Sequence, residues 1–226
     1  MQRPSTLLGI VILLSALACG CTQSLVYSPS MNMPAQPLKG NQMQLLGGVG
    51  NLAETRPDKT EDSSETAFGC EGALRIGLCE HFTLQFKGWK DLSDNLRSQR
   101  YGTSFSVLAT LNDSSKWRFT LIPTAALVFG GGDLEGGGGG LFLSPAYNPR
   151  RDISFYLAFG PAFGMRKLEQ ENKQWGWGLL ANCGSSLLIR DKLTVNVELA
   201  GVRQVNEYDD IKDFMICPSL NLGYIF

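Results

Sequence analysis

The sequence has no surplus of charge of either sign and almost no histidine, and each shortage excludes a class of function. Its 226 residues include 20 Lys or Arg and 21 Asp or Glu, so the formal net charge is −1. Without a basic excess the chain is unsuited to neutralising phosphates, and we expect no nucleic-acid partner. Because His81 is the only histidine, a His-rich metal site and any mechanism that needs two imidazoles are excluded. After residue 40, no stretch has a convincing helical period.

Residues 1–21 have the order of a targeting segment. A positive start at Arg3 precedes an apolar stretch, residues 7–17, that is too short to span a membrane as a helix. In a lipoprotein signal, the cysteine after the cleavage site is acylated, with palmitate among the chains. We expect lipidation at Cys21, with Cys19 as the alternative, because Gly precedes Cys21 and polar residues follow it. An ordinary secretory signal with an incidental cysteine stays open. In both cases the chain is exported to an oxidising compartment.

Period-2 alternation predicts that the rest of the chain forms strands with two unlike faces. In residues 82–88, for example, apolar side chains alternate with Thr83, Gln85 and Lys87. Strands of about ten residues suit a tilted crossing of a bilayer. The ten expected strands lie near residues 42–50, 67–77, 81–89, 101–111, 117–130, 137–147, 153–164, 175–189, 193–204 and 211–226.

The connections between these strands alternate in length, as they do in a transmembrane β-barrel with short periplasmic turns and long outer loops. The short connections are residues 78–80, 112–116, 148–152 and 190–192, and the longer ones are 51–66, 90–100, 131–136, 165–174 and 205–210. The Gly-rich region 131–140 is poorly patterned, so a count of eight strands stays open beside ten.

The two strand faces differ in a way that favours a membrane barrel over a soluble one. One face is bulky and apolar. The other is small and polar and carries charges in mid-strand, namely Glu71, Arg75, Lys87, Arg118 and Glu198. We predict an all-β, antiparallel up-and-down barrel, whose inward charges pair across a narrow, plugged lumen. A soluble sandwich or lipocalin-like barrel, with its apolar face inward, is the alternative.

Aromatic residues fall near both ends of the expected strands, which indicates two interfacial girdles. Those at the loop ends are Trp89, Tyr101, Trp175 and Trp177, and those near the turn ends are Trp117, Tyr147 and Phe226.

The end of the chain carries a family resemblance. Phe226, preceded at alternate positions by Tyr224 and Leu222, resembles the C-terminal signal read by the outer-membrane barrel assembly machinery. With its lipoprotein signal, the chain resembles small outer-membrane β-barrel lipoproteins best known from Bacteroidota. Those proteins often begin with Cys, followed by a tether with a Tyr-x-Pro-like motif, which here corresponds to residues 26–29. A Pro-Leu-x-x-Lys-Gly-x-x-Gln run comes next, here residues 37–42, and then a Gly-rich first strand, here residues 47–50.

The resemblance implies a fold and a location in the outer membrane, and no assigned activity. It implies a signal peptide over residues 1–20, a periplasmic tether over 21–40 and a barrel over 41–226. The implied anchor is an acylated cysteine in the periplasmic leaflet, and the implied partners are outer-membrane lipid and the assembly machinery. The specific ligand stays unknown.

The remaining reactive residues do not form a recognisable catalytic or metal site. Some small barrels resemble lipid A acyl hydrolases, which need Ser two residues after His, but His81 is followed by Phe82 and Thr83. The acidic stretch 54–65 lacks the spacing of a calcium loop. Four further cysteines are too scattered for zinc, and a disulfide among them stays open; they are Cys70, Cys79, Cys183 and Cys217. We expect no catalytic residue, no metal and no cofactor, and hence no enzyme.

The sequence therefore indicates an outer-membrane barrel lipoprotein with a structural or surface-interaction role. Two alternatives stay open: a narrow-pore or lipid-handling transport protein, and a soluble periplasmic lipocalin-like ligand binder.

Overall fold

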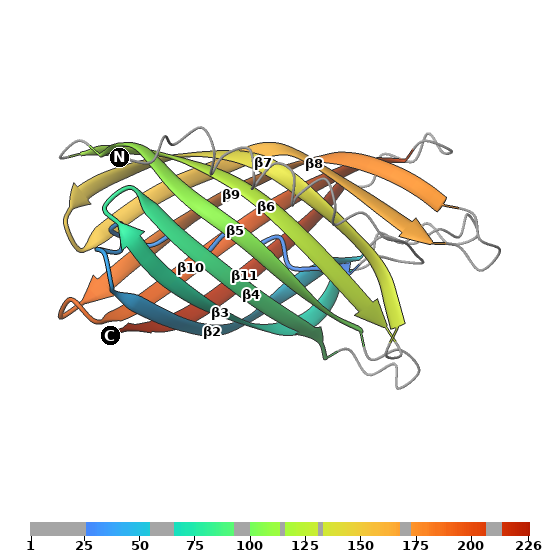
Figure 1. Cartoon of the computed structure of the whole chain (residues 1–226), viewed down its shortest axis with the longest axis horizontal. Helices are drawn as coiled ribbons and strands as arrows, with labels where there is room; N and C mark the ends of the chain where they lie inside the picture. Colours follow the sequence, from blue (N-terminus) through green and yellow to red (C-terminus); the bar gives the residue numbers. More distant parts are fainter. Residues whose placement is uncertain are drawn as a thin grey trace.

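The computed structural model describes residues 26–54, 66–92, 100–113, 116–130, 133–167, 173–206 and 214–226. These residues form one short strand and ten long ones, and no described helix is long and apolar enough to cross a membrane. The strands are β1 (Val26–Tyr27), β2 (Met43–Glu54), β3 (Thr66–Cys79), β4 (Phe82–Asp91), β5 (Arg100–Asp113), β6 (Trp117–Gly130), β7 (Asp133–Arg150), β8 (Ile153–Lys167), β9 (Lys173–Ile189), β10 (Leu193–Asn206) and β11 (Phe214–Ile225) (Figure 1).

The ten long strands close into a single antiparallel barrel. Each pairs with its neighbour in sequence, and β2 also pairs with β11, which joins the first long strand to the last. The prediction of ten strands in an up-and-down barrel is confirmed. The Gly-rich region left open by the sequence lies within β7, where Gly136–Gly140 pair with Arg166–Ala162 of β8.

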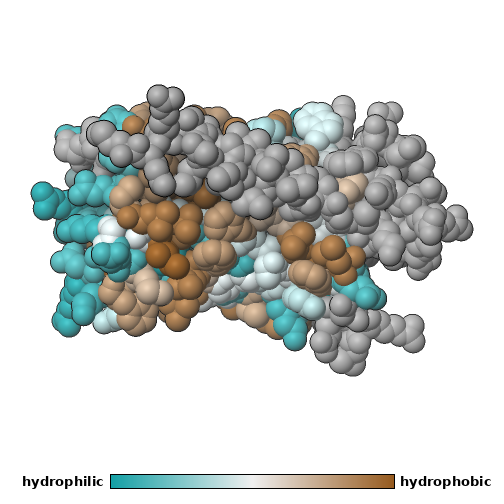
Figure 2. All heavy atoms as spheres, viewed as in Figure 1, coloured by the Kyte–Doolittle hydropathy of each residue, from teal (hydrophilic) through white to brown (hydrophobic). Residues whose placement is uncertain are grey.

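The side chains alternate between the two faces of the wall, with the bulky apolar ones outside. In β10, Val197 is 52% exposed, whereas Asn196 is 0% exposed on the inner face. The outer surface carries apolar side chains over the strands, seen as brown atoms in Figure 2. A lipocalin-like barrel has its apolar face inward, so this outward facing contradicts the soluble alternative. An apolar outer band is the arrangement that lipid requires.

One end of the barrel has tight turns. Residues 80–81 join β3 to β4, 151–152 join β7 to β8, and 190–192 join β9 to β10. In the last of these, Arg190 and Asp191 have positive φ angles of 52° and 59°, as the central residues of hairpin turns of the I′ type do. We call this the short-turn end. The opposite, long-loop end carries the longer connections, which fall largely outside the described residues.

The expected aromatic girdles hold for most residues but not for Trp89. Tyr101, Trp117, Tyr147, Trp177 and Phe226 are all exposed on the outer surface, and the side chain of Trp175 lies outside the described residues. Trp89 is only 5% exposed and packs inside the barrel with Leu52, Ala67 and Val128. The alternation explains the error: Trp89 has the same parity as Lys87, so it belongs to the inner face.

Candidate functional site

The interior of the barrel is occupied by the chain's own N-terminal portion. Residues 28–38, here called the lumen segment, run from β1 toward the start of β2 in an irregular, extended course. Most of these residues are buried, and Met33 and Leu38 are each only 1% exposed. A tether in the periplasm would leave such side chains in water. The tether expected over residues 21–40 is described from Val26 onward, and its residues 28–38 lie in the lumen.

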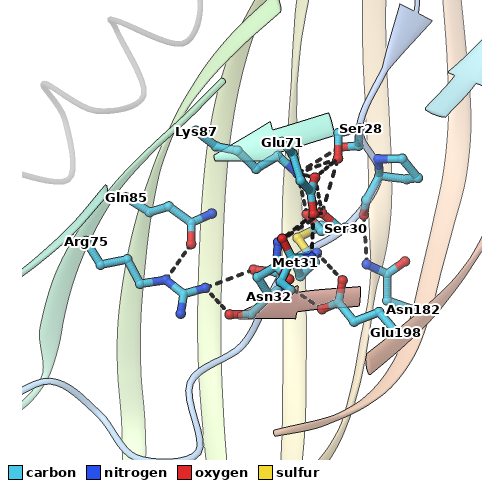
Figure 3. Close-up of polar contacts among 12 residues, drawn as sticks. Ser28, Ser30, Met31, Asn32, Glu71, Arg75, Gln85, Lys87, Asn182 and Glu198 are labelled. Atoms are coloured by element: carbon cyan, nitrogen blue, oxygen red, sulfur yellow. Dashed lines mark hydrogen bonds and ion pairs between the residues drawn. The ribbon is translucent and has the colours of Figure 1, made fainter. Parts of the chain in front are cut away.

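The first contacts of the lumen segment are with a buried ion pair. Lys87 Nζ lies 3.3 Å from Glu71 Oε2, and both side chains are 3% exposed. Lys87 Nζ donates to the carbonyl oxygens of Ser28 (3.1 Å) and Ser30 (2.7 Å). Glu71 in turn accepts from the hydroxyls of Ser28 and Ser30 and from Asn32 Nδ2 at 3.0 Å (Figure 3). The pair thus stabilises the segment rather than bridging an empty lumen.

The middle of the lumen segment is bound from two sides. Glu198 accepts hydrogen bonds from the backbone N–H groups of Met31 (2.9 Å) and Asn32, and also from the Tyr156 hydroxyl. On the other side, Arg75 donates to the carbonyl oxygens of the same two residues, Met31 and Asn32 (Figure 3). The peptide group between Met31 and Asn32 is therefore bound by opposite charges, its carbonyl oxygen by Arg75 and its N–H by Glu198.

Arg75 is itself held in place by the wall. Its Nε donates to Gln85 Oε1 at 2.6 Å, and its Nη1 donates to Gln44 Oε1 at 2.9 Å. Because two neighbouring strands fix the guanidinium plane, the remaining donors point at the lumen segment without a large loss of side-chain entropy on binding.

The C-terminal part of the lumen segment reaches the short-turn end. Arg118, near the start of β6, donates to the carbonyl oxygens of Pro34 (2.6 Å) and Ala35 (3.1 Å). Gln36 Nε2 donates to the carbonyl oxygen of Arg151, in the turn between β7 and β8. The chain then leaves the lumen and turns back to begin β2.

The structure thus places all five charges selected from the sequence on the inner face, with buried side chains. It brings Glu71 and Lys87 together directly, and it joins Arg75, Arg118 and Glu198 to the lumen segment. The sequence reasoning missed the partner, because it expected these charges to pair across the lumen. The available signal was three prolines and no charge in residues 28–38, a composition that suits neither a strand ladder nor a solvated linker.

A cavity of about 180 Å³ lies above the lumen segment, toward the long-loop end. Ser28, Pro29, Ser30 and Met31 contribute to its floor, and Phe142 lies on its wall. The wall is hollow because inner positions of β7, β8 and β9 are glycines, which leave no side chain to fill the space. The glycines that line the cavity from the same inner face as Phe142 are Gly138, Gly140, Gly164, Gly176 and Gly178.

The lining of this cavity is mostly apolar. Val128, Leu180 and Val202 contribute side chains, and the hydroxyls of Ser104 and Thr124 add a few polar groups. A cavity of roughly 150 Å³ suffices for a benzene-sized molecule. The site therefore suits a small, largely apolar ligand.

The other residues singled out from the sequence do not join the lumen network. Cys70, Cys79, Cys183 and Cys217 are free thiols; Cys183 is exposed, whereas Cys217 is buried on the inner face. His81 is exposed in a short turn. Among the described residues, no group of three His, Cys, Asp or Glu side chains could hold a metal ion. The expected lipidation site Cys21, its alternative Cys19, and residues 55–65 of the acidic stretch lie outside the described residues.

The proposed assembly signal lies on the outer surface of β11. Leu222 and Tyr224 are 54% and 41% exposed, and Phe226 is 70% exposed. The backbone N–H of Phe226 donates to the carbonyl oxygen of Met43 at 2.8 Å, so the terminal residue continues the seam between β11 and β2.

Comparison with known proteins gives the fold and no closer relationship. No protein-family model matches the chain, and no curated protein matches its sequence. Among solved structures, an outer membrane channel from Pseudomonas putida F1 superposes with a TM-score of 0.53 at 10% identity, over 84% of this chain and 96% of that one.

Two further structures are less similar. The outer membrane protease OmpT from Escherichia coli gives a TM-score of 0.44 at 10% identity, over 83% of this chain and 94% of that one. The KdgM porin in complex with disordered oligogalacturonate gives a TM-score of 0.43 at 13% identity, over 82% of this chain and 98% of that one. What the superposition with the channel shows is shared architecture: this chain is a closed antiparallel barrel of the outer-membrane type.

Proposed function

We propose that this chain is a lipid-anchored outer-membrane barrel, closed by its own lumen segment, with a structural or surface-interaction role rather than an enzymatic one. The observation that carries the proposal is the buried network between residues 28–38 and the five inward charges. A segment held through its backbone by Lys87, Arg75, Glu198 and Arg118 has no free path to move aside. Displacing it would leave several charges buried without partners, which costs several kcal/mol for each broken pair.

A channel is less well supported than a plugged barrel. Ten strands enclose a narrow lumen, and wide aqueous pores need about 16. Here the narrow lumen is further filled by Met31, Asn32 and Met33, each at most 9% exposed. The expected role is therefore to present the outer loops and the wall to the membrane and to the surroundings of the cell.

Conductance in planar lipid bilayers tests this proposal. The wild-type barrel should show no steady ionic current. A variant in which residues 28–38 are replaced by a Gly-Ser sequence of equal length should conduct, because it lacks the buried Met and Leu side chains that fill the lumen and the prolines that keep the segment extended. Arg150→Ala, a change at an exposed ion pair at the short-turn end, serves as the matched control and should stay silent. A steady current through the wild-type barrel would overturn the proposal in favour of a pore.

The lipid anchor is the second part of the proposal. An apolar stretch that ends in Ala-Cys-Gly-Cys supports acylation at Cys21, with Cys19 as the alternative. Metabolic labelling with palmitate should be lost in Cys21→Ala or transfer to Cys19. Labelling that persists when both cysteines are replaced would refute lipidation at this site.

A lipid-handling role is the second candidate function, and the apolar cavity favours it. The cavity lies on the long-loop side of the lumen segment, so a ligand would enter from that end and stop at Ser30 and Met31. Such a protein would bind or shelter a small apolar molecule without passing it across the membrane.

A further inference from the structure

The lumen segment has a direction, and four successive contacts define it. β1 pairs with the last residues of β2, Val26 with Glu54 and Tyr27 with Ala53, which lie at the long-loop end. Ser28 and Ser30 then meet Lys87 and Glu71, and Pro34 and Ala35 meet Arg118 near the start of β6. Finally, the backbone N–H of Asn41 donates to the carbonyl oxygen of Gly77, beside the turn after β3.

The chain therefore enters the barrel at the long-loop end and leaves it at the short-turn end. Figure 1 shows this course as the blue trace, which starts at the right beside the end of β2 and reaches the opposite end, where β2 begins. In barrels of this type, short turns face the periplasm and long loops face the outside. Val26 accordingly lies at the outer end of the barrel.

The seam between β2 and β11 leaves room for the chain at that end. β11 begins at Phe214, yet it pairs with β2 only from Ser219 onward. The ladder ends beside Pro218, which has no N–H to donate. The edge of β2 that β11 does not use, at Ala53 and Glu54, is the edge that pairs with β1.

The distance from Val26 to the lipidated cysteine is short. Four residues lie between Cys21 and Val26, and a fully extended chain over these five steps spans at most about 18 Å. β3 has 14 residues, and strands of that length, tilted by about 40°, span roughly 35 Å along the barrel axis. From the outer end of the barrel, Cys21 is thus unable to reach the periplasmic leaflet.

We propose that the N-terminus of the mature chain is threaded through the lumen and emerges at the cell surface, so that the acyl chains of Cys21 insert into the outer leaflet. The inference of an outer-leaflet lipid rests on the proposed lipidation, whereas the threading does not. It replaces the periplasmic anchor expected from the sequence. The chain is then fixed to the surface side of the membrane by lipid, with the barrel closed around its own lumen segment.

The threading imposes an order on assembly. An acylated N-terminus is too bulky to pass through a lumen that the segment itself fills. The seam between β2 and β11 must therefore close around a segment that is already in place. The charges of the inner wall give that segment binding partners on β3, β4, β6 and β10 before the seam forms.

Surface labelling of intact cells tests the threading. In a full-length background whose four barrel cysteines are replaced by alanine, Ser24→Cys is exposed to a maleimide carried on a polymer too large to cross the outer membrane. Ser63→Cys, in the connection after β2, is the matched outer control, and Glu80→Cys, in a short turn, is the matched inner control. The background without a new cysteine reports any unmodified thiol at Cys21 or Cys19. Heat-modifiable mobility on gels selects the variants that form barrels.

The expected result is that Ser24→Cys labels on intact cells to the same extent as Ser63→Cys, while Glu80→Cys labels only after permeabilisation. Labelling of Ser24→Cys only after permeabilisation would overturn the proposal. If Ser24→Cys resists the reagent in both conditions, an epitope inserted between Gln23 and Ser24 replaces it. Antibody binding to intact cells then supports the threading, and binding only to permeabilised cells overturns it.

Palmitate incorporation, measured on the same samples, separates the two proposals. Surface labelling without palmitate would leave the threading intact and refute the lipoprotein. Palmitate incorporation together with labelling of Ser24→Cys only after permeabilisation would support the lipoprotein and refute the threading. A surface Ser24→Cys with palmitate supports the outer-leaflet anchor.

Discussion

The ion pair between Glu71 and Lys87 gives the sharpest energetic test of the lumen network. Its charged atoms lie 3.3 Å apart, and both side chains are 3% exposed. With an effective dielectric constant of about 20, two unit charges at this distance attract by roughly 5 kcal/mol. Removing one member of a buried pair costs about 3–5 kcal/mol, because the other charge stays buried without its partner.

We expect Lys87→Met and Glu71→Gln each to lower the free energy of unfolding by about that amount. Lys87→Met should be the worse of the two, because it also removes the donor to the carbonyl oxygens of Ser28 and Ser30. In the double variant the electrostatic loss is counted once, so the two effects should be non-additive by about 3 kcal/mol or more.

Equilibrium unfolding in lipid vesicles, followed by tryptophan fluorescence over a denaturant series, measures all four proteins of the cycle. The matched control is the exposed pair of Arg150 and Asp152, whose atoms lie at a similar 3.1 Å but whose side chains are 70% and 37% exposed. The coupling free energy between Arg150 and Asp152 should be at most about 1 kcal/mol, because water screens the charges. A coupling below about 0.5 kcal/mol for Glu71 and Lys87 would refute the reasoning, since independent sites add to within that margin.

Three further predictions concern the wall, the seam and the cavity. Val197→Arg should lower the free energy of unfolding in vesicles by about 2–4 kcal/mol, because the side chain faces hydrocarbon; Val197→Leu is the control, and equal stability of the two would contradict the assigned facing. Deleting Phe226 should reduce the barrel in outer-membrane fractions on immunoblots and leave periplasmic protein for proteases, and unchanged levels would place the assembly signal elsewhere. Ala126→Phe should fill the cavity and abolish calorimetric binding of indole, a small apolar probe, whereas Ala181→Phe on the outer surface should not; equal binding by both would locate the ligand outside the lumen.

The wall of the barrel was predictable because its physics is local. Side chains in a strand alternate with period 2, so a lipid-facing row of apolar residues leaves a direct record in the sequence. Leu193 to Leu199 illustrates this: Val197 is exposed and Asn196 and Glu198 are buried, as the alternation predicts. The same rule, applied to Trp89, would have placed it inside; a girdle inferred from position along the strand overrode the parity.

The lumen segment was not predictable in the same way, because nothing in residues 28–38 repeats. Pro29, Pro34 and Pro37 break any strand pattern, and the absence of charge gives no pairing signal. Whether such a segment is buried depends on groups that four distant strands place in the lumen. Its location is thus a property of the closed barrel rather than of its own composition, and the reading of it as a tether followed from the resemblance alone.

The inward charges and the irregular segment explain one another once backbone hydrogen bonds are counted. A single extended chain inside a closed barrel has no strand partner, yet its buried N–H and C=O groups still require hydrogen bonds. The prolines reduce the number of donors, because they have no N–H. The carbonyl oxygens are met by side chains of the wall, all with longer reach than a backbone group: those of residues 28 and 30 by Lys87, 29 by Asn182, 31 and 32 by Arg75, and 34 and 35 by Arg118.

The two N–H groups in the middle are met by one carboxylate, that of Glu198. Charged groups make stronger hydrogen bonds than neutral ones, so a few side chains suffice for a whole segment. The charges that the sequence places in mid-strand, at positions where a barrel wall could have carried Ser or Gly, therefore act as the missing strand partner of the lumen segment. Replacing Lys87, Arg75, Arg118 or Glu198 by an apolar residue therefore leaves backbone groups of the segment unpaired as well as changing the charge of the lumen.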